Sequence, residues 1–239
     1  MKLNLLLAMA LGASLLTVTG CATIVAGDEG TGGLPEQPID APPPPPPGDP
    51  VVDETPPPPP PPPPELLTQS LAWENGSVER AAWSAELRTQ VAANLTSFDK
   101  ASDMASFCPA YGSLTKDQKV EVLSTLIVGI ARYESGYDPR QRYHEPDGSW
   151  SVGLYQLSYT DGFSWCTLNE ASKSLEDPIN NIKCAVPKMA RLVARDKVFA
   201  AGSNLSNAMG LARYWSVTWL GRHISDLRGL TSNLAVCIA

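Results

Sequence analysis

The stretch KDQKVEVLSTLIVGIARYESGYDP, residues 116–139, decides the fold of this chain. Its apolar residues recur at spacings of three and four, which predicts a helix with one buried face formed by Val120, Leu123, Ile127 and Ile130. Glu134 continues this apolar stripe, four residues after Ile130. A carboxylate on the buried face of a helix must be paired, neutralised or used, so Glu134 is the first candidate functional residue.

Burial would give Glu134 a specific chemical use. Partial burial raises the pKa of a carboxylic acid toward neutral pH, where the group can still donate a proton. General-acid cleavage of a glycosidic bond requires such a donation to the leaving oxygen. Glu134 is therefore a candidate general acid, and the alternative is a solvated residue at a helix end.

Three further elements follow the Glu134–Pro139 run in order: the run Gly153–Leu157, the pair Asn181-Ile182 and the pair Tyr214-Trp215. Together the four elements resemble the signature of the soluble lytic transglycosylases, lysozyme-like enzymes that cut the glycan strands of bacterial peptidoglycan. The resemblance covers roughly residues 116–219. It implies a mainly α, lysozyme-like (SLT) catalytic domain whose long active-site loop has room for one short hairpin.

The resemblance also implies a reaction. These enzymes cleave the β-1,4 bond between N-acetylmuramic acid (MurNAc) and N-acetylglucosamine (GlcNAc) with a single carboxylic acid. Glu134 would protonate the leaving oxygen, and the 6-hydroxyl of the same MurNAc would attack the anomeric carbon to give a 1,6-anhydro end. The deprotonated Glu134 would then serve as the base. The high effective molarity of an intramolecular nucleophile favours this route.

The substrate-binding residues are implied by the same motifs. In the family's pattern, Gly153 brings the backbone close to the sugar chain and Gln156 hydrogen-bonds N-acetyl or hydroxyl groups. Tyr214 resembles the tyrosine that approaches the catalytic acid. Tyr155, which replaces the usual Met, and Ser135 complete the predicted set. A structural role stays open for each of them: a turn glycine, a surface amide, core packing or a helix cap.

A second carboxylate would indicate a different mechanism, because ordinary glycosidases use two. Four candidates lie within thirty residues of Glu134: Asp138, Glu145, Asp147 and Asp161. The aspartates are expected in turns, since each is followed by Gly or Pro, which leaves Glu145. If Glu145 is a second catalytic carboxylate, the protein would be a goose-type lysozyme-like hydrolase that uses water as the nucleophile. A third alternative is a non-catalytic peptidoglycan-binding lipoprotein.

Other helices are predicted within one domain that spans residues 65–239. One carries apolar residues at intervals of four from Trp83 to Leu95, after a cap at Ser77. Another begins at Asp177-Pro178, where a capping residue is followed by proline at the first helical position. A last helix is predicted from about Ser206 to Trp215.

Residues 140–164 are rich in Gly, Pro, Asp and aromatic residues and lack a long periodicity, which predicts a long loop. Loops of this length in compact domains are usually functional. Trp150 and Trp165, together with Trp215, could stack on sugar faces or fill the core.

The cysteines divide into one and four. Cys21 is expected to carry lipid. The remaining four cysteines are Cys108, Cys166, Cys184 and Cys237, and an even number of cysteines in an exported chain predicts two disulfides. Three pairings are possible, and we favour Cys166–Cys184 with Cys108–Cys237. We predict no metal site and no cofactor, because no Cys-x-x-Cys is present and the only two histidines are far apart in sequence.

The N-terminal part resembles a bacterial lipoprotein. Residues 1–20 read as a signal peptide, and Val18-Thr19-Gly20-Cys21 resembles a lipobox, so Cys21 would anchor the chain in a membrane. Ala22 resembles the outer-membrane sorting pattern, which would place the domain in the periplasm. The alternative is an ordinary secretory signal with a free Cys21.

Residues 21–64 form a predicted acidic, proline-rich tether. Residues 22–64 hold 18 of the 23 prolines, and such runs adopt the extended polyproline II helix. We expect a spacer, and a ligand for a proline-binding partner is the alternative. Residues 22–64 also carry seven acidic and no basic side chains, whereas from Glu65 onward 18 acidic residues face 17 basic ones. Neither part has the basic surface that nucleic-acid binding requires. The resemblances to the lytic transglycosylases and to bacterial lipoproteins imply glycan strands and a membrane as partners.

Overall fold

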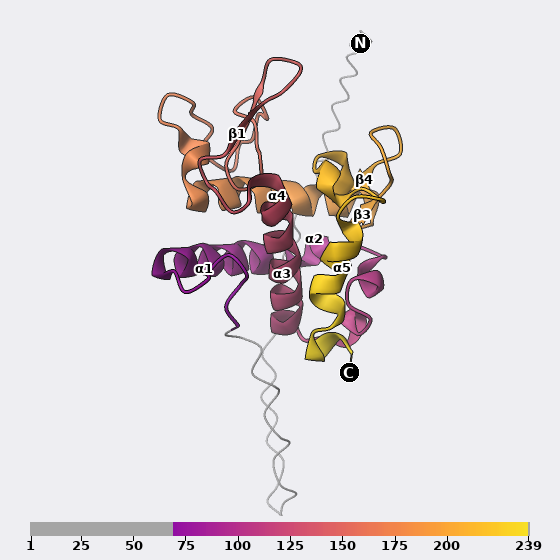
Figure 1. Cartoon of the computed structure of the whole chain (residues 1–239). Helices are drawn as coiled ribbons and strands as arrows, with labels where there is room; N and C mark the ends of the chain where they lie inside the picture. The colour runs from indigo at the N-terminus through magenta and orange to yellow at the C-terminus, as the bar shows by residue number, and fades with distance from the viewer. Residues whose placement is uncertain (1–68, 239) are drawn as a thin grey trace, which may run out of the picture. The chain divides into compact units, whose positions relative to one another are not determined.

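The structure, a computed structural model, describes residues 69–238 (Figure 1). The predicted signal peptide, the lipidation site at Cys21 and the tether over residues 21–64 lie outside the described residues. The described part is mainly helical, with five α-helices: α1 (Val78–Ala93), α2 (Leu95–Phe98), α3 (Lys116–Ser135), α4 (Pro178–Asp196) and α5 (Ile224–Ser232). None of the helices in this part of the chain is both long and apolar enough to span a membrane.

Short elements connect these helices. Two antiparallel pairs of strands are present: β1 (Arg142–His144) with β2 (Trp150–Val152), and β3 (Ala200–Ala201) with β4 (Met209–Gly210). The 3-10 helices are η1 (Met104–Ser106), η2 (Tyr111–Ser113), η3 (Ser174–Glu176), η4 (Leu211–Arg213), η5 (Ser216–Thr218) and η6 (Ala235–Cys237). The β1–β2 pair is the one short hairpin for which the sequence left room.

Helix α3 is the central element of the domain. It packs against α1 and α5, and α4 packs against α1; Figure 1 shows α1 and α4 running side by side, crosswise to α3 and α5. Its apolar stripe is buried as predicted, with Leu123, Ile127 and Ile130 wholly inaccessible. The α1–α3 contact also contains a charged pair, because Arg88 donates to both oxygens of the buried Glu121 carboxylate at 2.6 and 2.9 Å.

The ends of α3 follow from its sequence. At the start, the Gln118 backbone N–H donates to the Thr115 hydroxyl at 3.3 Å, and the Thr115 N–H donates to the Gln118 side chain at 2.9 Å, which is the predicted capping box. At the end, Gly136 adopts the left-handed conformation with φ +61°, which glycine tolerates without a steric penalty. Glu134 is thereby held in the last turn of α3.

The helix expected over residues 206–215 is wrong. This segment forms a turn, strand β4 and η4. Gly210 has φ +59°, and a β-carbon there would lie 2.3 Å from the Phe199 carbonyl oxygen, so the close approach of the segment just before β3 determines the backbone conformation at Gly210. Helix α5, which the sequence analysis missed, instead covers α3. The helices predicted after the caps Ser77 and Asp177 are confirmed as α1 and α4.

Both predicted disulfides are confirmed. Cys166 is bonded to Cys184, and Cys108 is bonded to Cys237. The first joins the long loop after β2 to α4. The second joins η6, near the C-terminus, to the segment before α3 across a sequence separation of 129 residues.

Candidate functional site

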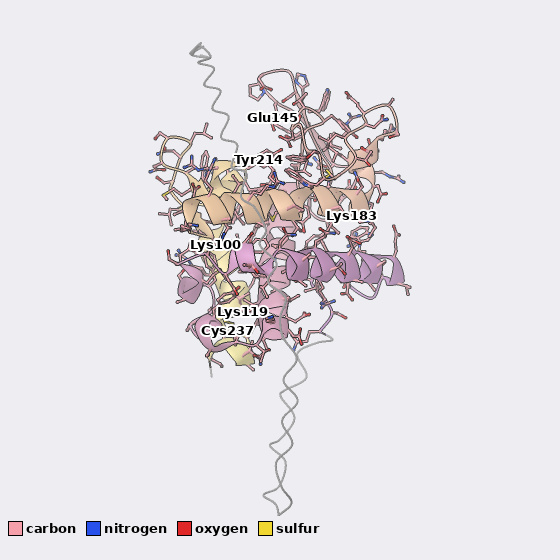
Figure 2. The ribbon with its side chains drawn as sticks, turned by 180° about the vertical axis from the view of Figure 1, so that it is seen from behind. Lys100, Lys119, Glu145, Lys183, Tyr214 and Cys237 are labelled. Atoms are coloured by element: carbon pink, nitrogen blue, oxygen red, sulfur yellow. A yellow bond between two sulfur atoms is a disulfide. The ribbon has the colours of Figure 1, made fainter. Side chains whose placement is uncertain are left out.

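A cleft of about 690 Å³ lies at the C-terminal end of α3, where Glu134 forms part of its wall. The other walls come from the β1–β2 hairpin, from residues 156–161 and from residues 214–222, and the side chains used below are Tyr143, Glu145, Gln156, Asp161, Tyr214 and Arg222. Figure 2 shows Glu145 and Tyr214 toward one end of the domain, with Cys237 near the other. The Cys108–Cys237 disulfide is therefore remote from the cleft.

The pKa of Glu134 is raised from 4.5 to about 7. The larger cause is burial, which penalises the charged carboxylate, and the smaller is the negative charge of Glu145. A carboxylic acid with this pKa is partly protonated at neutral pH and can act as a proton donor. The property predicted from the position of Glu134 in the helix stripe is therefore present.

The hairpin explains how Glu145 comes to line the cleft. Its register pairs Tyr143 with Ser151 and His144 with Trp150. Since successive residues of a strand point to opposite faces, Tyr143 shares one face with its partner Ser151 and with Glu145, two residues further on, and all three line the cleft. The Ser151 hydroxyl donates to Glu145 at 2.5 Å. This alternation is the signal that would have added Tyr143 to the predicted site.

Trp150 does not line the cleft, although the sequence offered it as a surface for stacking sugars. It contacts His144, with ring centroids 4.8 Å apart, and the Arg142 guanidinium, 5.2 Å from its ring centroid. Trp165 is likewise absent from the lining, since it stacks on Phe163 and Arg191. Trp215 does line the cleft, but it is 1% exposed and therefore packs mainly in the core.

Three of the predicted substrate-binding residues have structural roles instead. Tyr155 is completely buried, so its predicted contact with substrate is wrong. Gly153 is required by packing, because a β-carbon there would lie 2.3 Å from both the Asn181 side chain and the Leu175 carbonyl oxygen. The Ser135 hydroxyl lies 3.1 Å from the carbonyl oxygens of both Ala131 and Leu154, either of which can accept its proton, and the contact with Leu154 ties α3 to the turn containing Gly153.

Asn181 is the support for this turn. It is fully buried on α4, accepts from the Tyr155 N–H at 3.0 Å and donates to the carbonyls of Val152 and Leu175 at 3.1 and 2.9 Å. Gln156 then lines the cleft with φ +48°. Its amide nitrogen donates to the carbonyls of Gln141 and Gly153 at 3.1 and 2.9 Å. The amide therefore holds the base of the hairpin and leaves its oxygen for other contacts.

Tyr214 lines the cleft, as predicted, and belongs to a polar network. Its hydroxyl donates to Asp161 at 2.7 Å, and the Lys188 ammonium lies 3.0 Å from the other oxygen of that carboxylate. The ammonium also lies 3.1 Å from the centroid of the Tyr214 ring. Burial lowers the pKa of Lys188 to about 8, although the charge of Asp161 opposes that effect. Burial and the neighbouring Asp161 raise the pKa of Tyr214 above its usual range.

The sequence analysis treated Asp161 only as a turn residue and missed Lys188 and Arg222. Asp161 does serve the turn, since it accepts from the Ser158 N–H at 3.1 Å. Its contacts with Lys188 and Tyr214 depend on the packing of α4 and η4, which no local pattern reveals. Among residues 69–238, no group of three or more His, Cys, Asp or Glu side chains is arranged to hold a metal ion.

Comparison with known families gives one match. Residues 113–203 match the model described as "Transglycosylase SLT domain". This range contains Glu134, the Gly153–Leu157 run and Asn181, whereas Tyr214 lies beyond it. No curated protein matches the chain in sequence.

Three solved structures titled Bd0314 DslA are similar to this chain. The wild-type form 2 is 28% identical with a TM-score of 0.59. Two Glu-to-Gln mutants are 27% and 28% identical, with TM-scores of 0.59 and 0.58. Each comparison covers 70% of this chain and 97% of the DslA chain. The substituted glutamates of DslA lie eleven residues apart in its sequence.

Proposed function

Because the chain contains a transglycosylase SLT domain with a lysozyme-like fold, we propose that it is a peptidoglycan lytic transglycosylase. It cleaves the β-1,4 bond between MurNAc and GlcNAc and leaves 1,6-anhydro-MurNAc ends. The observation that carries this proposal is Glu134, which lines a cleft at the end of α3 and has a pKa raised to about 7. Peptidoglycan glycan strands are the substrate class that the SLT domain implies.

The reaction proceeds in two steps with one carboxyl group. Protonated Glu134 donates its proton to the bridging oxygen, the bond to the MurNAc anomeric carbon breaks, and the GlcNAc hydroxyl leaves. The resulting Glu134 carboxylate takes the proton from the 6-hydroxyl of the same MurNAc, whose oxygen bonds to the anomeric carbon. The proton returns to Glu134, and no water is consumed. The protein must hold the two sugars so that the 6-hydroxyl is close to the reacting carbon.

A specific observation favours a second candidate, a hydrolase that uses water. Glu145 lines the same cleft as Glu134, and its charge contributes to the raised pKa of Glu134. Glu134 and Glu145 are eleven residues apart, the same spacing as the two substituted glutamates of DslA. In this mechanism Glu145 activates a water molecule while Glu134 acts as the acid.

Product analysis distinguishes these candidates. Purified sacculi are treated with the protein, and the released muropeptides are identified by mass spectrometry. A lytic transglycosylase releases anhydro ends, which are lighter than reducing ends by one water. Reducing ends would favour the hydrolase. Release of no muropeptides, with binding to sacculi retained, would favour a non-catalytic peptidoglycan-binding protein.

We also propose that the enzyme works from a membrane. Lipidated Cys21 would anchor it in the outer membrane, and the tether over residues 21–64 would hold the domain over 65–239 in the periplasm, at the height of the cell wall. Polyproline resists collapse, and acidic flanking residues add self-repulsion. If deletion of residues 42–64 leaves wall cleavage in cells unchanged at matched expression and lipidation, the spacer role is wrong.

A further inference from the structure

We infer that Arg222 binds a carboxylate on the side arm of MurNAc, and thereby selects glycan strands whose MurNAc side arms carry a negative charge. This inference rests on the proposed function, since it assigns a substrate group to the same cleft. The observations that carry it are the charges of the cleft, the rigid support of Arg222 and the contacts of its guanidinium.

Acidic side chains outnumber basic ones in the lining of the cleft. Four carboxyl side chains line it, those of Glu134, Glu145, Asp147 and Asp161, whereas Arg222 is the one cationic side chain among the described lining residues. The negative charge of Glu145 repels an anionic group of the substrate, whereas Lys188 offsets the charge of Asp161 and Glu134 acts in its protonated form. Arg222 is therefore the lining residue that attracts an anionic group of the substrate. The difference in charge between Arg222 and the acidic residues favours one orientation of a charged substrate.

The backbone around Arg222 is fixed by hydrogen bonds. The Arg222 N–H donates to the Trp219 carbonyl at 3.1 Å, and the flanking residues Leu220 and His223 donate to the carbonyls of Gly202 and Val217 at 2.8 and 3.2 Å. Gly221 supplies the left-handed conformation that this turn needs, with φ +80°. The turn is thus held in place before any substrate binds, which lowers the entropic cost of binding.

The Arg222 side chain packs on a ring that is itself anchored. Its guanidinium carbon lies 5.3 Å from the centroid of the Trp219 ring, and the Trp219 indole N–H donates to the Ala212 carbonyl at 2.7 Å. A planar guanidinium suits such a contact and keeps its N–H donors available.

No carboxylate among the described residues forms an ion pair with Arg222, and no hydrogen bond engages its guanidinium. Arg88 and Arg213, by contrast, form ion pairs with Glu121 and Asp196 at 2.6 Å each. A guanidinium has five N–H donors. Two of them can form parallel hydrogen bonds to one carboxylate, so a guanidinium that faces the cleft suits a carboxylate of the substrate.

In a glycan strand of peptidoglycan, the carboxylates lie on the MurNAc side of the scissile bond. GlcNAc has none, whereas the lactyl group of MurNAc carries the peptide stem with its free carboxylates. If the stem has been removed, the lactyl group itself ends in a carboxylate. The shared chemistry is a carboxylate on the MurNAc side arm, and the experiment separates its two sources.

The test compares kcat/KM on three soluble glycan preparations. The first carries intact stems, the second carries stems whose carboxylates have been converted to neutral methylamides, and the third has been freed of stems so that lactyl carboxylates remain. The wild type is compared with Arg222→Gln, with Arg222→Lys and with a matched control, Arg140→Gln. Arg140 is exposed and does not line the cleft, so this control removes the same charge elsewhere.

We expect the wild type and Arg140→Gln to prefer intact stems over neutral stems by about tenfold, the size of a charge-assisted hydrogen bond. Arg222→Gln should lose this preference, and Arg222→Lys should keep part of it. A preference that persists on the strands with lactyl carboxylates alone would identify the lactyl group as the partner. An equal preference in the wild type and Arg222→Gln would overturn the inference.

A binding measurement separates this inference from the proposed function. Glu134→Gln and the double variant Glu134→Gln/Arg222→Gln are titrated with the same strands, without turnover. Weaker binding of the double variant to intact stems alone would support the inference even if the wild type cleaved nothing, an outcome that would overturn only the proposed function. Equal binding of the two variants to every preparation would overturn the inference whether or not the wild type is active.

Discussion

The Tyr214 hydroxyl donates its proton to Asp161 at 2.7 Å. The family resemblance had suggested that Tyr214 approaches the catalytic acid, and Glu134 is indeed near enough for its charge to act on the pKa of Tyr214. A phenol has one proton to donate, so Tyr214 cannot donate to Glu134 at the same time. Lys188 offsets the charge of Asp161. The network therefore fixes Tyr214 beside the cleft without adding an uncompensated charge to it.

This arrangement predicts the effect of Lys188→Met. Asp161 would keep its negative charge beside the cleft with no cation to offset it, which would favour the protonated form of Glu134. We expect the alkaline limb of the pH profile of kcat/KM to move to higher pH. We also expect the free energy of unfolding to fall by about 1–3 kcal/mol, because a partly buried carboxylate loses its partner.

The control for this prediction is Lys183→Met. Lys183 lies on the same helix but is exposed, and it contacts Glu86 only at 3.9 Å. We expect this variant to keep the pH profile of the wild type. An unmoved alkaline limb in Lys188→Met, in protein that is fully folded by circular dichroism, would contradict the role given to the network.

Substitution of Glu145 tests the number of catalytic carboxylates. Glu145→Gln removes the charge that helps to raise the pKa of Glu134, so the alkaline limb of kcat/KM should move to lower pH. In the transglycosylase mechanism the maximal rate should fall by less than about tenfold, because no base other than Glu134 is used. A loss of a hundredfold or more at the optimal pH would instead support the two-carboxylate hydrolase. Glu170→Gln, on an exposed residue outside the cleft, serves as the control.

The two faces of the hairpin predict different effects of removing an aromatic ring. Tyr143 is 56% exposed and lines the cleft, whereas Trp150 is 41% exposed and does not. If Tyr143 stacks on a sugar, Tyr143→Ala should raise KM for glycan strands by about tenfold and Tyr143→Phe should not. Trp150→Ala is the matched control and should leave KM close to that of the wild type. A similar rise in KM in both alanine variants would indicate general damage to the hairpin.

The raised pKa of Glu134 predicts a cost in stability. Its pKa is 4.5 in the unfolded chain and about 7 in the folded domain, so the folded state binds more protons than the unfolded state between these values. The free energy of unfolding should therefore fall as pH rises from about 4.5 to about 7. The contribution of Glu134 to this fall is at most about 3 kcal/mol.

Urea denaturation of the wild type and Glu134→Gln at pH 4.5 and pH 8 measures this cost. The amide cannot ionise, so the variant should be the more stable protein at pH 8, and the difference should shrink at pH 4.5. A variant that is less stable than the wild type at pH 8 would contradict the burial of an ionisable acid at this position.

The sequence predicted those parts of the structure that local patterns determine. The α3 stripe, its capping box and Gly136 define the helix that positions Glu134, and all three are local features. Gly153 and Tyr155 were assigned to substrate, but their surroundings depend on Asn181, which lies on a different helix. The helix expected over residues 206–215 does not form for a similar reason, since the backbone of Val198 and Phe199, just before β3, occupies the space beside Gly210.

Charged residues of the cleft were the hardest to predict. Lys188 and Arg222 come from α4 and from the turn before α5, and neither belongs to a motif. Packing of the turn before α5 brings Arg222 to the cleft of Glu134, and packing of α4 brings Lys188 to Asp161 beside that cleft. The sequence located Glu134, whereas the three-dimensional arrangement was needed to find Lys188 and Arg222.

The most direct test of the central claim is the rate at which Glu134→Gln releases muropeptides from purified sacculi, measured beside the wild type by mass spectrometry. The substitution keeps the size of the side chain and removes the proton that it donates. We predict that the wild type releases products with 1,6-anhydro-MurNAc ends and that the variant, folded and still able to bind sacculi, releases them at least about a hundredfold more slowly. Release by Glu134→Gln at a rate close to that of the wild type would contradict the claim that Glu134 is the catalytic acid.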